Sequence, residues 1–148
     1  MTSIFIDFLP DDLQPGVFVR RLGNGRERSD QEVLDYWRET LARFPGTKRT
    51  FVWNFSIALY DAAHGKMWSC RVEQRSFVAD EFSKKIRPGY PMSSFLIPEG
   101  FDKPSTELTA LERAQLDERV FSPFLEVFPT WLAEAEALSS TSNWPTLA

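Results

Sequence analysis

The sequence predicts a single α/β domain in which helices flank a β-sheet. Its 148 residues are a usual length for one domain, and a 43% hydrophobic content, with thirteen Phe and five Trp, is enough to fill a core. Apolar residues alternate over 51–60, which indicates a strand. Apolar residues recur at three- and four-residue steps over 33–44, which indicates a helix that covers something. Together, the two periodicities favour a sheet covered by helices.

Composition excludes several classes of protein. A net charge of −4 argues against nucleic acid or a membrane surface as the main partner. The chain has no run of about 18 apolar residues, and its first residues lack the basic start and long apolar stretch of a signal peptide. The single cysteine, Cys70, rules out an intrachain disulfide, which fits a reducing compartment. We therefore predict a cytoplasmic protein with no nucleic-acid and no membrane partner.

The first elements follow from short local patterns. The apolar run Ile4–Ile6 predicts a buried strand that ends at Asp7. Ser29 and Glu32 have the spacing of a capping box, so a helix should begin there and end before Pro45-Gly46. The apolar stripe of this helix consists of Val33, Trp37, Leu41 and Phe44.

The second half should form a meander and then two helices. The strand over 51–60 is followed by weaker strand patterns over 67–73 and 75–80. Thr109 and Glu112 repeat the capping-box spacing and start a helix that runs to about residue 121. Ser122-Pro123 then predicts the start of another helix, which Pro129 bends or ends. We assign residues 1–138 to one domain and residues 139–148 to a flexible tail.

Few residues suggest chemistry without outside comparison. The sequence contains neither the glycine-rich loops of nucleotide-binding motifs nor a Cys/His cluster for zinc. Asp7 is either a metal ligand at a strand end or a turn residue. Four arginines over 20–28 either contact phosphate or form a solvated basic loop. Lys103 lies in a loop shortly before the start of a helix, where a bound anion is favoured. The alternative is that Lys103 is an ordinary solvent-exposed lysine.

Several stretches, in order, resemble the inosine triphosphate pyrophosphatase family. FLIPEGFDKPSTELTALERAQLDER, residues 95–119, resembles the family's signature. LQPGVFVRRL (13–22), SDQEVLDYWRETL (29–41) and RTFVWNFSIALYDAAHGK (49–66) resemble its Pro-Gly segment, its intervening helix and its central strand. The similarity extends over about residues 4–132.

The resemblance implies a fold and an activity. Members have a twisted mixed β-sheet flanked by helices, hold a nucleotide in a cleft between two lobes, and are usually homodimers. They are magnesium-dependent hydrolases that cut non-standard purine nucleoside triphosphates between the α and β phosphates and release pyrophosphate. By resemblance this chain is a nucleoside triphosphate pyrophosphatase with a purine nucleotide as its partner.

The resemblance also implies site residues. Lys103 matches a loop lysine that binds the nucleotide. Arg119 matches the arginine of a Ser-His-Arg motif that helps to hold the purine. Arg21 aligns with an arginine that follows the Pro-Gly turn, as a nucleotide-binding residue. Asp7 matches an acidic strand end that serves as a metal ligand or general base, and is the expected catalytic residue.

The chain also departs from the family's pattern. The family's first strand and its Ser/Thr-x-Asn-x-x-Lys triphosphate loop have no counterpart, which implies a trimmed N-terminal lobe. A Gly-Tyr-Asp-Pro loop is replaced by Gly89-Tyr90-Pro91-Met92, and Ser-His of Ser-His-Arg by Asp117-Glu118. A sheet edge left by the missing strand would need cover from this chain or from a second subunit. Three readings stay open: an active pyrophosphatase, a catalytically impaired relative that binds nucleotide or protein, and an unrelated α+β domain.

Overall fold

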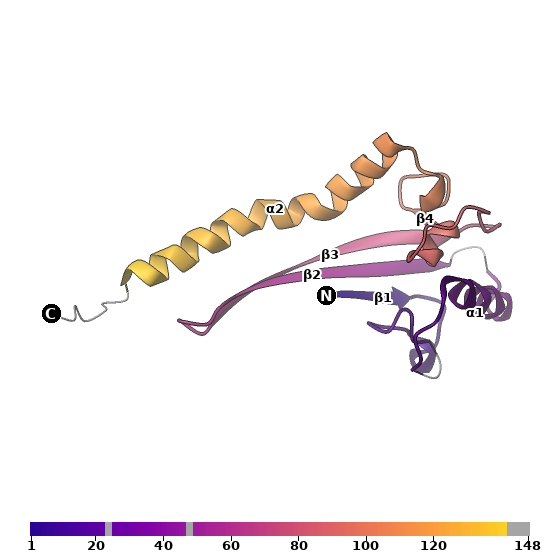
Figure 1. The fold of residues 1–148 in the computed structure, drawn as a ribbon, viewed down its shortest axis with the longest axis horizontal. Coiled ribbons are helices and arrows are strands. Elements are labelled where there is room, and N and C mark those ends of the chain that lie inside the picture. Colours follow the sequence, from indigo (N-terminus) through magenta and orange to yellow (C-terminus); the bar gives the residue numbers. More distant parts are fainter. Residues whose placement is uncertain (23–24, 47–48, 142–148) are drawn as a thin grey trace.

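The expected sheet flanked by helices is present in the structure, a computed structural model that describes residues 1–22, 25–46 and 49–141. In these residues β1 (Thr2–Ile6), β2 (Thr50–Asp61), β3 (Lys66–Val78) and β4 (Leu96–Pro98) form one sheet in that order (Figure 1). Every pairing among these strands is antiparallel, where the resemblance implied a mixed sheet. The α/β class is confirmed, and the meander connection predicted for the central strands is the one observed.

The two central strands form a hairpin that extends beyond its neighbours. β1 pairs with β2 only as far as Phe55, and β4 pairs with β3 only over Ser76–Val78. Residues 57–71, here called the hairpin arm, therefore form a two-stranded ribbon that projects from the body with a helix alongside (Figure 1). The separate strands predicted over 67–73 and 75–80 are one strand, because Gln74 between them is paired opposite Trp53 without a break.

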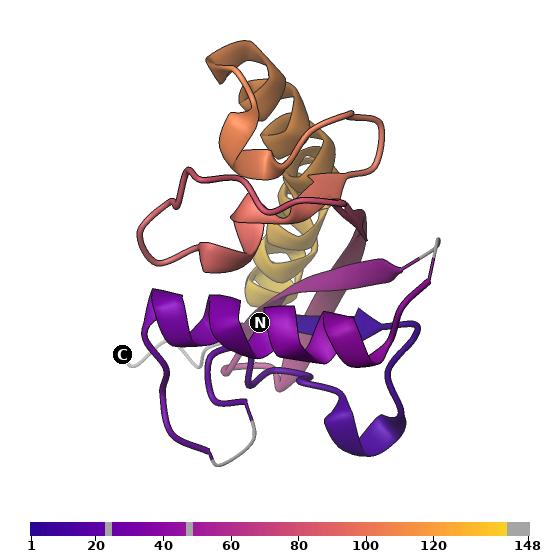
Figure 2. The same cartoon turned by 90° about the vertical axis from the view of Figure 1, so that its right-hand side faces the viewer.

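Helix α1 (Asp30–Arg43) begins and ends where the sequence predicted. The Glu32 amide donates to the Ser29 hydroxyl over 3.2 Å, and the Ser29 amide donates to the Glu32 carboxylate over 2.7 Å. This capping box satisfies two amides that the first turn leaves unpaired. Figure 2 shows α1 crossing one end of the sheet, in front of the strands.

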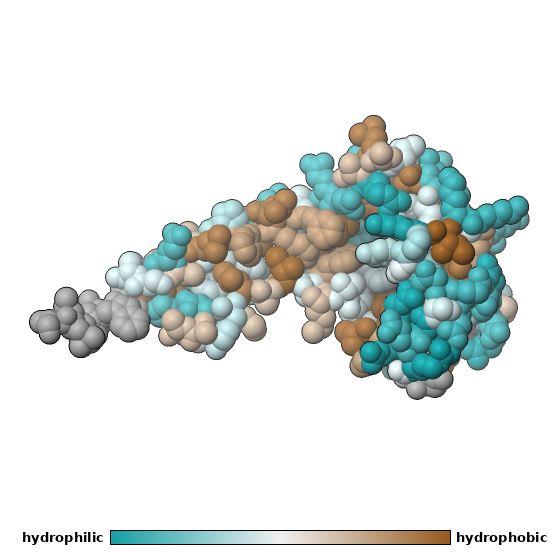
Figure 3. Space-filling model, in the orientation of Figure 1, coloured by the Kyte–Doolittle hydropathy of each residue, from teal (hydrophilic) through white to brown (hydrophobic). Residues whose placement is uncertain are grey.

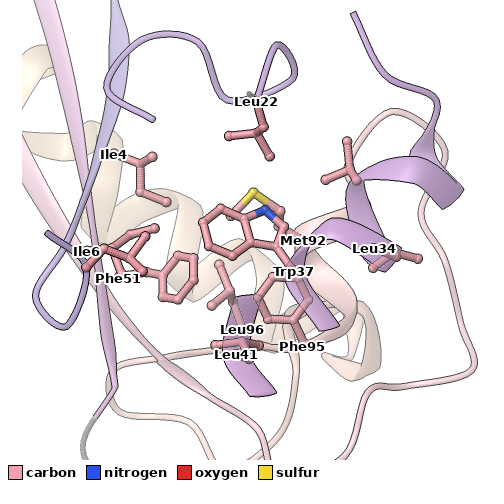
Figure 4. Close-up of a cluster of buried hydrophobic side chains, with 12 residues drawn as sticks. Ile4, Ile6, Leu22, Leu34, Trp37, Leu41, Phe51, Met92, Phe95 and Leu96 are labelled. Atoms are coloured by element: carbon pink, nitrogen blue, oxygen red, sulfur yellow. The ribbon is translucent and has the colours of Figure 1, made fainter. Parts of the chain in front are cut away.

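The hydrophobic core lies between α1, one face of the sheet and the segment around Met92 and Phe95 (Figure 4). Trp37 of α1 is fully buried, and its ring contacts Phe51 of β2 edge-on with 5.1 Å between ring centroids. Burial of a Trp and a Phe here removes a large apolar area from water and fixes α1 against the strands. The other core side chains include Ile4, Ile6, Leu34, Leu41 and Leu96.

The C-terminal helices predicted on either side of Ser122 are a single helix, α2 (Ala110–Thr141), so the predicted break is wrong. Pro123 and Pro129 both lie inside it. An interior proline costs about 3 kcal/mol of helix stability, but Val120, Phe124 and Trp131 are buried on both sides of Pro123 and hold the helix to the sheet. Residues 139–141 of the predicted tail are helical, and residues 142–148 lie outside the described part of the chain.

The outer edge of β1 is covered by the protein's own chain. The Ile4 amide donates to the Gly16 carbonyl over 2.8 Å, and the Ile6 amide donates to the Gln14 side-chain oxygen over 2.9 Å. The Gln14 amide group donates back to the Ile6 carbonyl over 2.6 Å. These bonds use the groups with which another strand would pair. Within the described ranges, neither helix has the length and apolar character needed to cross a membrane.

Candidate functional site

A cleft of about 340 Å³ lies between the sheet and the N-terminal half of α2. Strand β2 contributes Trp53 and Phe55, β3 contributes Gln74 and Ser76, and α2 contributes Asp117 and Phe121. In Figure 1 the N-terminal end of α2 stands further from the strands than its C-terminal half does. The volume is within the range of small-molecule sites, which runs from about 300 to 1,000 Å³.

The cleft combines aromatic walls with a polar floor. Trp53 and Phe55 are alternate residues of β2 and so point to the same face of the sheet, where Phe55 meets Phe121 with 6.3 Å between ring centroids. Gln74 is buried opposite Trp53, and Ser76 is buried one step further along that face. Aromatic side chains favour a planar ring, and the amide and hydroxyl can fix its orientation by hydrogen bonds.

The third wall is a loop that carries Arg87, Tyr90 and Ser93 into the cleft lining. Gly89 adopts a φ of +81°, a left-handed conformation that favours glycine. Its amide donates to Asp30 over 2.9 Å, and Arg20 donates both to Asp30 over 2.8 Å and to the Gly89 carbonyl over 3.2 Å. The N-terminal end of α1 thus anchors the loop at Gly89, the first residue of the Gly89-Tyr90-Pro91-Met92 segment.

The Asp30 carboxylate that anchors this loop is ionised at neutral pH. The pKa of Asp30 is lowered, first by the hydrogen bond from the Gly89 amide and then by the bond from Arg20. Both bonds favour the carboxylate over the acid. The loop position therefore depends on an ionised Asp30.

Asp7 and Arg21, two of the four predicted site residues, line other hollows. Asp7 follows β1 and lies at the opposite end of that strand from Thr2, which lines the cleft. Its carboxylate accepts the Thr50 amide over 3.0 Å, in a hollow that also contains Arg71 and Arg75. Arg21 is exposed and lines a hollow beside Phe18 and Tyr36.

Lys103 lies on the loop before α2, and Arg119 of α2 lies against the same loop. The Lys103 ammonium is 3.0 Å from the Glu112 carboxylate, which also accepts the Thr109 amide in the predicted capping box. The Arg119 guanidinium lies 5.7 Å from the centre of the Phe101 ring. A Cβ at Gly100 would come within 3.1 Å of this guanidinium, so glycine permits the approach. Within the described chain, the lining of the cleft includes Asp117 but neither of these two cations.

Sequence reasoning identified Asp117 as a substituted position but missed most of the cleft. The alternation of β2 was enough to place Trp53 and Phe55 on one face. Nothing local indicated that Phe121 would face them, because a helix break was expected beside it.

The donor atoms around Asp7 do not form a cage for magnesium. The only other carboxylate lining that hollow is Glu73, whose side chain is 2.5 Å from Arg71. Among the described residues, no group of three or more His, Cys, Asp or Glu side chains is arranged to hold a metal. Magnesium is usually held by one or two carboxylates together with substrate phosphates rather than by an all-protein cage, so a magnesium requirement stays a prediction.

Comparison with known proteins gives a match at the level of structure. No protein-family model matches the chain, and no curated protein matches it. The crystal structure of a nucleoside-triphosphatase, a dITP/XTP pyrophosphatase from Mycobacterium abscessus, is similar with a TM-score of 0.64 and 21% sequence identity. The match covers 86% of this chain, and 64% of the length of that chain. The likeness shows that the two chains share a fold.

Proposed function

We propose that the protein binds a purine nucleotide in the cleft and acts as a nucleoside triphosphate pyrophosphatase on non-standard purine nucleotides. The observation that carries the proposal is the set of rings, Trp53, Tyr90 and Phe121, around the buried Gln74 and Ser76. Stacking on an aromatic side chain is worth about 1–3 kcal/mol per base. The shared fold also supports this proposal, since the similar structure is that of a dITP/XTP pyrophosphatase.

In the proposed reaction a water oxygen bonds to the α phosphorus, and the bond to the oxygen that bridges to the β phosphate breaks. The products are a nucleoside monophosphate and pyrophosphate. Asp7 as general base or metal ligand, Lys103 and Arg21 as nucleotide-binding residues, and Arg119 as a purine contact remain predictions from the resemblance. A requirement for magnesium also remains a prediction from the resemblance.

The alternative is a relative that binds nucleotide or protein without hydrolysis. Two observations favour it. The Lys103 charge is already paired with Glu112, and Asp7 lies beyond the end of β1 that is far from the cleft. Loss of one well-placed electrostatic group costs an enzyme about 10²–10³ in rate. Binding in the cleft does not need Lys103 or Asp7, so an assay that measures binding and hydrolysis separately can distinguish the two functions.

We further propose a cytoplasmic homodimer. Phe121, Leu125, Phe128 and Leu132 are exposed at three- and four-residue steps along α2, and so form one apolar stripe. Figure 3 shows apolar residues gathered along this part of the molecule. A second copy of the chain would cover the stripe, and Cys70 as the single cysteine is consistent with a reducing compartment.

The deciding experiment is a thermal-shift panel with ITP, XTP, dITP, ATP and their monophosphates in the presence of magnesium, with pyrophosphate release read in the same wells. A shift with release that Lys103→Ala abolishes supports the enzyme. A shift without release supports the binding module. Failure of every nucleotide to shift the melting temperature contradicts both nucleotide functions.

A matched pair of variants locates the binding. Phe121→Ala should weaken nucleotide affinity by about tenfold, because a stacking surface of about 1–3 kcal/mol is lost. Phe128→Ala, on the same exposed stripe but outside the cleft lining, should leave affinity unchanged. Equal effects of the two substitutions would place the nucleotide elsewhere.

A further inference from the structure

A second hollow, of about 520 Å³, lies beside the cleft and is basic. Its lining consists of Lys85, Ile86, Arg87, Thr106 and Arg113. Three of these side chains are cationic and, among the described residues that line it, none is a carboxylate. We call this region the basic hollow.

The cations of the basic hollow are held in place by neighbours. Arg113 donates to the Ser105 carbonyl over 2.6 Å, which orients its guanidinium. The Lys85 ammonium is 2.9 Å from Glu107, and Glu107 also accepts a bond from the Ser83 hydroxyl. Among the described residues, Glu107 is the one carboxylate paired with any of the three cations, so it offsets one of three positive charges. The hollow keeps a positive balance that an anion would neutralise.

One polar atom in the basic hollow lacks a partner. The Thr106 hydroxyl oxygen is shielded from solvent, and no group within the described residues hydrogen-bonds to it. Because water does not reach this atom, a ligand oxygen in the hollow does not reach it either, and the three cations alone carry the case for an anion.

The basic hollow adjoins the cleft. Arg87 lines both, and its guanidinium lies 4.4 Å from the centre of the Tyr90 ring, which also lines the cleft. Ser105 of the cleft and Thr106 of the hollow are consecutive residues. The hollow therefore lies next to any ligand whose ring occupies the cleft, with Arg87 between the two.

We propose that the basic hollow binds the phosphate end of a nucleotide whose purine ring occupies the cleft. Arginine presents a planar fork of donors that matches phosphate oxygens, and lysine adds a point charge. The inference rests on the proposed function for the ring and adds the residues that hold the phosphate. It assigns that role to Lys85, Arg87 and Arg113, whereas the family resemblance pointed to Lys103.

Calorimetric titration of inosine and inosine 5′-monophosphate tests the assignment without any need for catalysis. In the unaltered protein the monophosphate should bind at least tenfold more tightly than the nucleoside, because each hydrogen bond to a charged group is worth about 1.5–3 kcal/mol. Arg113→Gln should reduce the monophosphate to the affinity of the nucleoside and leave the nucleoside unchanged. Arg43→Gln, a matched loss of an arginine at an exposed position outside the linings of the cleft and the hollow, should preserve the difference.

The outcomes separate the two proposals. If the nucleoside binds and the phosphate adds nothing, the basic hollow is not a phosphate site although the cleft stands. If neither nucleoside nor monophosphate binds, the proposed function fails, and a titration with pyrophosphate then tests the basic hollow alone. Saturable binding of pyrophosphate that Arg113→Gln abolishes would show that the hollow is an anion site. Absence of such binding would overturn the proposal. Should Arg113→Gln fail to fold, Lys85→Gln replaces it, since that side chain is 70% exposed.

Discussion

At the scale of single residues, Asp30 connects the start of α1 to the loop that forms a wall of the cleft. Its carboxylate accepts bonds from the Gly89 amide and from Arg20. A group that is 59 positions away in the sequence thereby sets the place of Tyr90.

Asp30→Asn should lower the free energy of unfolding by about 1–3 kcal/mol, because hydrogen bonds to a charged acceptor are replaced by weaker ones. The loss should be measured by urea unfolding at neutral pH. Asp35→Asn is the control, because that carboxylate is more exposed on the same helix and bonds only to local partners. Equal losses in the two variants would show that Asp30 has no special role.

The same substitution predicts a pH dependence. The folded pKa of Asp30 lies below its ordinary value of 3.8, so its contribution to stability is complete above that value. The contribution is lost as pH falls through the lower folded pKa, where the folded protein also takes up the proton. The difference in stability between the unaltered protein and Asp30→Asn should therefore be constant above about pH 5 and shrink on acidification. A difference that grows toward acid would contradict the assignment.

At the scale of elements, the edge of β1 is closed by one side chain and one carbonyl. Gln14 exchanges two hydrogen bonds with Ile6 and donates a third to the Leu9 carbonyl over 2.9 Å. Gln14→Ala should lower the free energy of unfolding by about 1–3 kcal/mol, because it leaves backbone groups without partners. It should also increase aggregation, since an open strand edge pairs with other chains.

Unfolding by denaturant and light scattering at increasing concentration measure the two effects. Gln115→Ala is the control, since Gln115 is exposed on α2. Unchanged stability in Gln14→Ala would mean that water replaces the side chain at no cost.

Helix α2 provides a second test at this scale. Pro129 is exposed and lies in the interior of the helix, where it supplies no amide to the preceding turn. Pro129→Ala should raise the melting temperature and add up to about 3 kcal/mol of stability. Thr130→Ala, the adjacent exposed position, should change stability much less. A lower melting temperature for Pro129→Ala would show that the proline shapes the helix to fit the hairpin arm.

At the scale of the whole molecule, α2 has a buried stripe and an exposed apolar stripe. The buried stripe includes Val120, Phe124 and Trp131, which pack on the sheet. In the exposed stripe Leu125 is 74% exposed, and Tyr60 and Met67 on the hairpin arm are also exposed. A two-stranded ribbon gains little stability alone, so a partner copy at this place would support both elements.

The proposed dimer predicts a change of molecular mass. Size-exclusion chromatography with light scattering should give twice the monomer mass at micromolar concentration, and Leu125→Asp with Leu132→Asp should give the monomer. Leu111→Asp is the matched control, because that leucine is 70% exposed near the start of α2 and lies outside the stripe. A monomeric unaltered protein would contradict the dimer directly.

Several features of the fold were predictable because they depend on neighbours within a few residues. Both capping boxes join residues three apart, and the strand period of β2 is a property of successive side chains. The antiparallel hairpin follows from the short turn between β2 and β3. The class of fold was predictable for the same reason.

By itself the sequence determined the starts of both helices, the face of β2 that turns toward them, and a resemblance that pointed to the right fold. Only the tertiary structure decided that α2 passes through two prolines, that Lys103 pairs with Glu112, and that Arg87 joins the cleft to the basic hollow. The reason is physical. Local backbone hydrogen bonds are set by adjacent residues, whereas burial, ion pairing and the meeting of distant side chains are set by how the elements pack, which no local pattern records.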